Sequence, residues 1–285
     1  MTWVVLGKNG QLGQELIYLL RSQGKKVVGT DREEIDFTKP EEIYDKLEKL
    51  EPKFLVNCGA YTQVDKAEEE PEISNLINGI APGAIAKFAL ENYVSFVHIS
   101  TDYVFDGNSK IAYKEEDQTN PQSVYGKSKL LGEQEVIERN PTAYILRTAW
   151  VYGEHGNNFP KVISKKLRNN ESLNVVNDQI GSPTWTFDLA SAIIEVLEKQ
   201  PNPGIYNVTN NEHCSWFEFA QEIAKTLEID STLVSPTDSK SFIRPAPRPS
   251  YSVLSNKKWK DAGLTPLQSW QDAWKKAAQT VLINS

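Results

Sequence analysis

Three glycines with the spacing GxxGxxG follow the first apolar run of the chain. They are Gly7, Gly10 and Gly13, and a segment of helical period extends from 11 to 23. A glycine-rich turn between a strand and a helix brings backbone N–H groups against a pyrophosphate at the positive end of the helix. Glycines also end strands and cap helices for structural reasons, so this spacing alone is weak evidence. Asp31 strengthens it, because it ends a second apolar run near the ~20-residue offset of a ribose-binding carboxylate.

Up to about residue 150, short apolar runs rich in β-branched residues alternate with longer segments of helical period. This alternation predicts an α/β fold, a doubly wound parallel sheet of the Rossmann type with helices on both faces. The expected strands are 3–7, 26–31, 54–59, 95–101 and 143–149, and the expected helices are 11–23, 40–50, 72–91 and 122–139.

The remaining half is less regular and holds every tryptophan except Trp3. We expect residues 1–150 to form a dinucleotide-binding domain, and 151–285 to form mainly a smaller, mixed α/β substrate lobe. Part of 172–210 is expected to return to the first sheet. The later pattern predicts helices at 158–168, 186–198, 216–227 and 267–282, strands at 173–176 and 205–208, and a loop near 235–250.

The charge pattern and the two cysteines limit the partners. The formal net charge is −7 with both signs interspersed, which argues against a nucleic-acid partner. Cys58 and Cys214 lie too far apart in sequence to indicate a zinc or disulfide framework, and no metal site is predicted. The apolar run at the N-terminus is too short for a signal peptide and no segment is as long as a membrane span, so we expect a cytoplasmic protein.

Tyr125 and Lys129 share one face of an expected helix, because they stand at i and i+4. A free tyrosine, with a pKa near ~10, is a poor acid at neutral pH, but a neighbouring cation favours the phenolate and lowers that pKa. The spacing also occurs by chance, with the lysine in solvent and the tyrosine packed. Thr101 favours a catalytic interpretation, because it ends an expected strand at the carboxyl edge of the sheet, where open α/β folds bind ligands.

Several motifs together resemble the extended short-chain dehydrogenases/reductases, namely residues 7–13, 57–62 (NCGAYT), 100–105 (STDYVF) and the pair of Tyr125 and Lys129. More narrowly, GKNGQLGQEL, AYTQVDKAE, STDYVFDG, VYGKSKLLGE, LRTAWVYG and DQIGSPTW, in this order, are similar to the dTDP-4-dehydrorhamnose reductases of that family. The resemblance is strong over about residues 1–190 and fainter as far as RPAPRPSYSVLSNKKW.

This resemblance implies an NAD(P)H-dependent oxidoreductase. Its reaction would be reduction of the C4 keto group of dTDP-4-dehydro-L-rhamnose to dTDP-L-rhamnose, a nucleotide sugar used in polysaccharide synthesis. By the resemblance, Tyr125 protonates the C4 oxygen, Lys129 lowers the pKa of Tyr125 and holds the nicotinamide ribose, and Thr101 orients the carbonyl.

The same resemblance assigns further residues to the two ligands. The cofactor-binding positions are Gly7, Gly10, Gln11, Leu12, Gly13, Asp31, Asp36, Phe37, Ala60, Tyr61, Thr62, Tyr125 and Lys129. The substrate-binding positions are Thr101, Asp102, Tyr103, Trp150, Asn158, Gln179 and Arg248, the last because a guanidinium suits a diphosphate.

The choice of cofactor stays open between NADH and NADPH. Asp31 would accept hydrogen bonds from a ribose 2′-OH and repel a 2′-phosphate, whereas Arg32 beside it would attract that phosphate. Some relatives bind magnesium at a dimer contact, so magnesium and a homodimer are both open, but the sequence assigns no ligands to the metal.

Two alternative functions also stay open. A sugar-nucleotide dehydratase of this fold would place a glutamate after Thr101 and Asp102, but the residue there is Tyr103, which favours simple reduction over a dehydratase or epimerase. A non-catalytic regulatory subunit would keep the fold and the cofactor site. The presence of Thr101, Tyr125 and Lys129 argues against that alternative.

Overall fold

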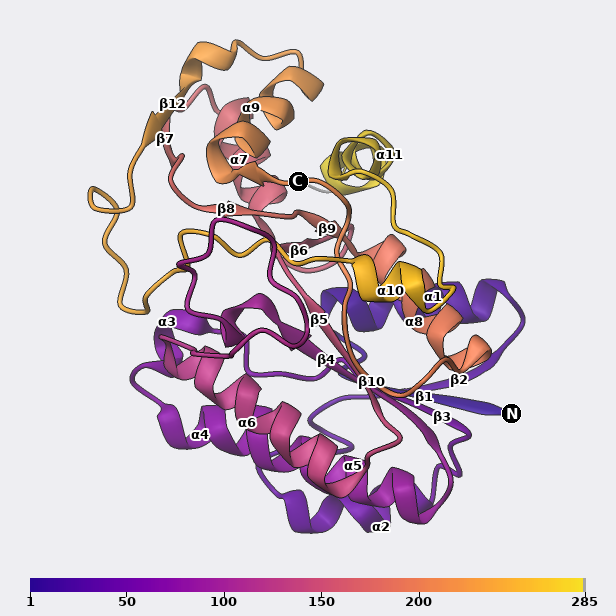
Figure 1. Ribbon diagram of the computed structural model, residues 1–285. Helices are drawn as coiled ribbons and strands as arrows, with labels where there is room; N and C mark the ends of the chain where they lie inside the picture. The colour runs from indigo at the N-terminus through magenta and orange to yellow at the C-terminus, as the bar shows by residue number, and fades with distance from the viewer. Residues whose placement is uncertain (284–285) are drawn as a thin grey trace.

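A parallel sheet of six strands forms the centre of the larger part of the molecule (Figure 1). The computed structural model describes residues 1–283. The strand order is β10-β5-β4-β3-β1-β2, so that β2 lies on one side of β1 and all later strands lie on the other. In open α/β sheets, ligands bind where the order of strands changes side in this way, here between β1 and β3. The predicted doubly wound α/β fold is confirmed. The strands are β1 (Thr2–Leu6), β2 (Lys26–Thr30), β3 (Phe54–Asn57), β4 (Ser95–Thr101), β5 (Tyr144–Thr148) and β10 (Gly204–Asn207).

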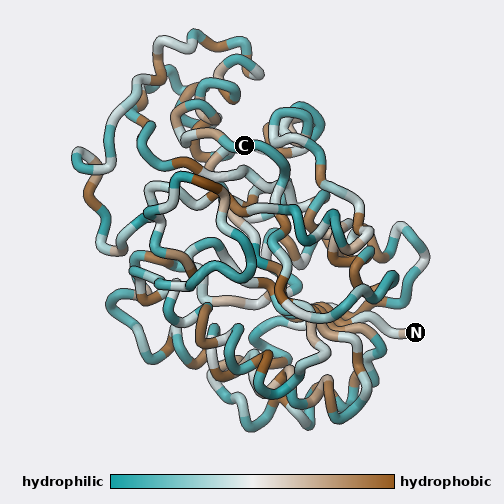
Figure 2. Tube along the Cα trace, viewed as in Figure 1, coloured by the Kyte–Doolittle hydropathy of each residue, from teal (hydrophilic) through white to brown (hydrophobic). Residues whose placement is uncertain are grey.

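Successive side chains of the strands face two different helical layers, as the period of two requires. In β1, Trp3 and Val5 pack into one apolar cluster, while Val4 and Leu6 pack into the other. Figure 2 shows the apolar segments gathered where the strands converge, with hydrophilic segments on the outer helix faces and loops. The first layer is α1 (Gln11–Ser22) and α8 (Thr186–Lys199), and the second is α2 (Ile43–Glu48), α5 (Ala81–Glu91) and α6 (Val124–Arg139).

The helix expected at 72–91 contains a change of geometry. It begins as α4 (Pro71–Asn75), continues as a π-helical turn η2 (Leu76–Ile80) and ends as α5. Within this turn, a Cβ at Gly79 would lie 2.5 Å from Leu131 Cδ2 on α6, so the glycine permits close packing of the two helices. The expected helix 40–50 likewise begins as a 3₁₀ turn, η1 (Pro40–Glu42). Two short helices were not predicted, α3 (Val64–Ala67) and α10 (Lys257–Asp261).

A second group of elements builds a separate apolar cluster in the upper part of Figure 1. Trp270, Trp274, Phe219 and Tyr152 are buried in it. The loop expected near 235–250 overlaps a strand that was not predicted, β12, which pairs in parallel with β7. The elements are β7 (Leu173–Val176), β12 (Val234–Thr237), α7 (Phe159–Arg168), α9 (Trp216–Thr226), α11 (Trp270–Ile283) and η4 (Ser231–Leu233). Short pairs join β6 (Val151–Tyr152) to β9 (Thr184–Trp185) and β8 (Ile180–Gly181) to β11 (Cys214–Ser215).

The chain crosses between the two groups more than once. β10 pairs with β5 in the central sheet, and α8 packs against α1, although both follow residue 150. A domain division at 150 therefore stays a prediction, and residues 284 and 285 of the expected lobe lie outside the described residues.

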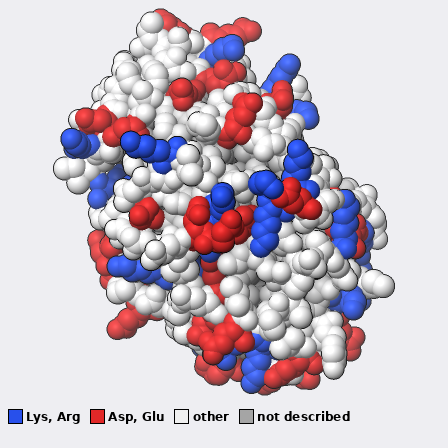
Figure 3. Space-filling model, in the orientation of Figure 1, with Lys and Arg blue, Asp and Glu red and all other residues white. Residues whose placement is uncertain are grey.

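The surface carries charges of both signs. Figure 3 shows Lys and Arg interspersed with Asp and Glu across the face in view. Within residues 1–283, no helix is both long enough and apolar enough to cross a bilayer.

Candidate active site

The glycine turn after β1 leaves no room for a Cβ at Gly7 or Gly13. Gly7 has φ +80°, and a Cβ on it would lie 2.8 Å from the backbone nitrogen of Gly59 after β3. A Cβ on Gly13 would lie 2.1 Å from the carbonyl oxygen of Gly7. Helix α1 starts after Gly10, and among the described residues no side chain caps it and no acid stands in its first turn. The first N–H groups of α1 are thus available to an anion.

Asp31 is tied to this turn by its own hydrogen bonds. Its Oδ2 accepts from the backbone N–H of Asn9 at 3.0 Å, and its Oδ1 accepts from that of Arg32 at 2.8 Å. The Arg32 side chain is 79% exposed and lies 3.8 Å from Asp36 Oδ2. The carboxylate and the guanidinium therefore both lie just after β2, and their role at the adenosine end of a dinucleotide stays a prediction.

The segment after β3 is held in place from both sides. Phe37 lies against Gly59, since a Cβ there would be 2.8 Å from Phe37 Cε2. The backbone N–H of Tyr61 donates to Asn78 Oδ1 at 2.8 Å, and Asn78 Nδ2 donates to the Tyr61 carbonyl at 3.0 Å and to Ser128 Oγ at 3.0 Å. Through the π-helical turn, residues 59–62 are thus fastened to α6.

The first turn of α6 brings Tyr125 to the end of β4. Ser123 caps the helix, its Oγ accepting from the N–H of Gly126 at 3.1 Å. A Cβ on Gly126 would lie 2.3 Å from the carbonyl oxygen of Tyr103, so the glycine lets α6 approach the 3₁₀ turn η3 (Asp102–Val104). The Thr101 side chain lies near the Tyr125 hydroxyl and favours its phenolate form. The predicted acid and the predicted orienting hydroxyl are therefore neighbours at the end of β4.

Burial raises the pKa of Tyr125 above its ordinary value, and the neighbouring Thr101 side chain opposes this rise. The direction differs from the lowering by Lys129 that we expected. Lys129 is only 2% exposed, and its Nζ donates to the carbonyl oxygen of Ile99 at 2.6 Å and lies 3.4 Å from His98 Nε2. Burial lowers the pKa of Lys129 to about 8. Tyr125 lies near Thr101 at the end of β4, the Lys129 amine lies against Ile99 within that strand, and desolvation dominates the pKa shifts of both groups.

Asp102 and Tyr103 continue the site beyond Thr101. Asp102 is 2% exposed, and its Oδ1 accepts from Thr101 Oγ1 at 2.8 Å, while burial raises its pKa to about 6. The Arg248 guanidinium lies 6.0 Å from the centroid of the Tyr103 ring and donates through Nη2 to Asp65 Oδ1 at 2.9 Å. A cavity of about 250 Å³ lies here, lined by Tyr103, Phe105, Asp106, Asn108, Gln122, Ser123, Pro247, Arg248 and Pro249.

The other predicted substrate residues lie after β5 and around β8. Trp150, with φ +48°, stacks on Trp216 at a centroid distance of 3.5 Å. Asn158 caps α7 and donates to Gln11 Oε1 at 3.0 Å and to the Gly153 carbonyl at 2.8 Å, so its amide is already hydrogen-bonded. Gln179 is half-buried next to β8.

The family of the chain follows from comparison with known proteins. Residues 1–283 match the family model described as RmlD substrate binding domain. The chain belongs to this family. The resemblance that the motifs indicated is thereby confirmed.

Relatives of this RmlD-family chain match it over nearly its whole length. A probable dTDP-4,6-dihydroxy-2-methyloxan-3-one 4-ketoreductase from Streptomyces antibioticus is 39% identical, over 99% of this chain and 96% of that protein. The structure of a dTDP-4-dehydrorhamnose reductase from Clostridium acetobutylicum has a TM-score of 0.95 and 39% identity, covering 99% and 100% of the two chains. A dTDP-4-dehydrorhamnose reductase from Bacillus anthracis, solved in complex with NADP, has a TM-score of 0.94 and 33% identity, covering 98% of each.

Sequence reasoning missed two buried residues that hydrogen-bond the backbone of the candidate site in this RmlD-family chain. Asn78 and Asn57 are buried and polar, and the hydrogen bonds that hold the segment after β3 pass through them. The signal in the sequence was an asparagine within an otherwise apolar expected strand (Asn57) and another within an expected helix (Asn78). A buried asparagine side chain needs a hydrogen-bond partner. His98, on β4, is fully buried.

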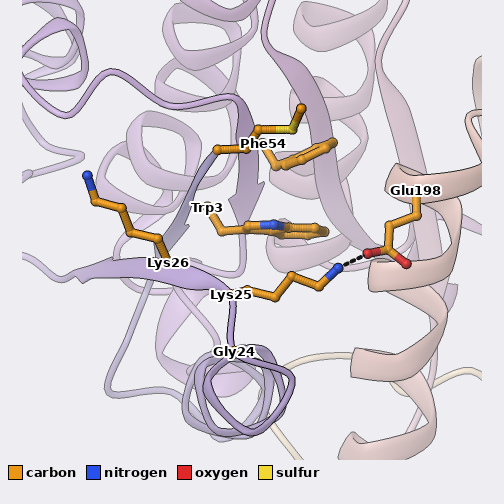
Figure 4. Close-up of a pocket in the computed structure, with 7 residues that line it drawn as sticks. Trp3, Gly24, Lys25, Lys26, Phe54 and Glu198 are labelled. Atoms are coloured by element: carbon orange, nitrogen blue, oxygen red, sulfur yellow. Dashed lines mark hydrogen bonds and ion pairs between the residues drawn. The ribbon is translucent and has the colours of Figure 1, made fainter.

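Among residues 1–283, no cluster of three or more His, Cys, Asp or Glu side chains is arranged to hold a metal ion. A cavity of about 520 Å³ lies at the opposite edge of the sheet, where Trp3 stacks on Phe54 and Lys25 pairs with Glu198 (Figure 4). Its lining includes none of the predicted site residues.

Proposed function

We propose that the chain reduces the C4 keto group of dTDP-4-dehydro-L-rhamnose to dTDP-L-rhamnose with NADPH or NADH. The main supporting observation is that Thr101 and Tyr125 are neighbours at the end of β4, with Lys129 buried one helical turn further along α6, at the same edge of the sheet as the glycine turn. The names of the relatives, which are ketoreductases and reductases of dTDP sugars, support the same reaction.

The glycine turn fits a nicotinamide dinucleotide. Its backbone leaves no room for a Cβ at Gly7 or Gly13, and the uncapped start of α1 offers N–H groups to a pyrophosphate. In the proposal Asp31 holds the adenosine ribose. The remaining cofactor positions are Gly10, Gln11, Leu12, Asp36, Phe37, Ala60, Tyr61 and Thr62. When bound, the reduced cofactor supplies a hydride to C4 of the sugar.

Tyr125 supplies the proton. Because burial raises its pKa, the phenol is protonated at neutral pH and can donate to the carbonyl oxygen, so that C=O becomes CH–OH. Thr101 orients that oxygen, and Lys129, when charged, stabilises the phenolate left behind. On the substrate side, Asp102, Tyr103, Trp150 and the weaker candidates Asn158, Gln179 and Arg248 would bind the nucleotide sugar. A homodimer and a cytoplasmic location stay predictions.

The decisive test is a cofactor-oxidation assay with dTDP-4-dehydro-L-rhamnose, with NMR of the product to give the configuration at C4. We expect the product to have the configuration of L-rhamnose at C4. We also expect kcat/KM to be at least about a hundredfold lower for free 4-dehydro-L-rhamnose, because binding energy from the diphosphate positions the sugar ring. Equal activity on the free sugar would contradict that role of the nucleotide. Turnover only with a dTDP-4-keto sugar of the D series would assign the chain to a different ketoreductase, and no turnover with either would favour a regulatory subunit.

Both NADH and NADPH are expected to support turnover. The Asp31 carboxylate accepts from two backbone N–H groups, and Arg32 is exposed beside it, so neither a 2′-OH nor a 2′-phosphate is excluded. Arg32→Ala should raise KM for NADPH by roughly tenfold and leave KM for NADH nearly unchanged, since only the 2′-phosphate needs the guanidinium. Steady-state kinetics with both cofactors check this. A preference of about a thousandfold in kcat/KM for one cofactor over the other, in the parent protein, would refute the prediction that both support turnover.

A further inference from the structure

A buried chain of polar groups connects β3 to Lys129. Asn57 and His98 are paired in register on β3 and β4, and both are fully buried. The N–H of Gly59 donates to Asn57 Oδ1 at 3.0 Å, Asn57 Nδ2 lies 3.1 Å from His98 Nδ1, and His98 Nε2 lies 3.4 Å from Lys129 Nζ. These contacts thus connect two strands of the sheet to the proposed catalytic lysine on α6.

The hydrogen bonds of Asn57 determine which ring nitrogen of His98 carries the proton. Only the oxygen of the Asn57 amide can accept from Gly59, so the NH₂ of that amide must face His98. His98 Nδ1 then accepts and has no proton. A neutral imidazole in this arrangement carries its proton on Nε2, which points this N–H toward Lys129.

An N–H directed at Lys129 disfavours the charged form of the lysine. An ammonium has three donors and no acceptor, so it would meet His98 donor to donor, whereas a neutral amine can accept from Nε2–H and still donate to Ile99. Burial acts in the same direction and also holds the pKa of His98 well below its ordinary value, so the ring stays neutral.

The other groups that face Lys129 do not reverse this balance. Glu133, one helical turn further along α6, favours the ammonium, but its carboxylate is also paired with buried Arg147. Burial raises the pKa of the Cys58 thiol to about 12, so this neighbour is neutral. Burial keeps Tyr125 neutral as well.

We propose that His98, fixed by Asn57, is a positioning residue that controls whether Lys129 is protonated. If the proposed reduction is correct, its consequence is that turnover falls on the alkaline side as Lys129 loses the charge that stabilises the phenolate. The inference about His98 itself does not require the reaction, and it can be tested on the protein alone.

The tautomer is tested by ¹⁵N NMR of the histidine rings. The chain has three histidines, so His155→Asn and His213→Asn identify the other two signals and leave that of His98 in an unaltered site. We expect a neutral His98 ring at neutral pH with the proton on Nε2. A proton on Nδ1, or an imidazolium, would overturn the proposal. Because only His155 and His213 are substituted, this test leaves His98 itself unaltered.

The effect on the lysine is tested by titrating ¹³C-labelled Lys129, assigned by the signal lost in Lys129→Met. His98→Asn keeps an acceptor for Asn57 but removes the N–H that faces the amine, so the midpoint should rise by about one pH unit. His213→Asn, at an exposed site, should leave it unchanged. An unchanged or lower midpoint in folded His98→Asn refutes the proposal. A raised midpoint without activity toward any dTDP-4-keto sugar supports it while refuting the proposed function.

Discussion

Tyr125→Phe is expected to lower the turnover number by at least about a hundredfold, because general acid catalysis contributes roughly 10²–10⁴ to such reactions. The ring should keep its packing, since it meets Tyr103 edge-on at a centroid distance of 5.5 Å and only the hydroxyl is removed. Binding of NADPH should change by less than about threefold, because the lost interaction forms with the reacting carbonyl. Steady-state kinetics and a fluorescence titration with NADPH measure the two quantities.

Tyr44→Phe is the matched control. Tyr44 packs edge-on against Phe88 and its hydroxyl accepts from Asn92 at 3.2 Å, among the helices that cover the sheet and not among the predicted site residues. It should retain full turnover. If Tyr125→Phe also kept more than half of the parent rate, Tyr125 would not be the proton donor, and a hydroxyl such as that of Thr101 or a bound water would have to replace it.

The central sheet was predictable because its strands are buried on both faces. Such strands are apolar throughout, and the helices between them keep a clear period, so five strands and the winding could be expected. β12 was missed because Ser235 and Pro236 lower its strand propensity. Its pairing with β7 depends on packing against α9, which local sequence does not encode. The π-helical turn was missed for a similar reason, since it follows from close contact of Gly79 with Leu131.

The candidate site was predictable where the chemistry lies within one short segment. Tyr125 and Lys129 are one helical turn apart, and the glycines of residues 7–13 form one turn. The supporting contacts join distant segments, such as Asn78 to Tyr61 and Asn57 to His98. The direction of the pKa shift at Tyr125 depends on burial, which the sequence does not quantify, and this explains why the expected lowering by Lys129 was not found.

Glu133→Gln is expected to lower the free energy of unfolding by about 3–5 kcal/mol, the usual cost of removing one partner of a buried ion pair. Glu133 accepts from Arg147 through both carboxylate oxygens, at 2.9 Å and 2.7 Å, and from Ser100 Oγ at 2.5 Å. The two charged side chains are only 2% and 3% exposed. With a neutral amide in place of the carboxylate, the guanidinium keeps its charge in a dry interior without compensation. Urea denaturation measures the loss.

The same pair ties α6 to β4 and β5, because Ser100 and Arg147 are partners in the strand register and Glu133 lies one turn after Lys129. A double variant, Glu133→Leu with Arg147→Met, should therefore recover much of the stability by removing both charges, although it loosens the hold on the catalytic helix. Glu135→Gln breaks the more exposed pair with Arg139 and should cost no more than about 0.5 kcal/mol. Equal losses for Glu133→Gln and Glu135→Gln would mean that water reaches Arg147, and that α6 is positioned by its apolar face alone.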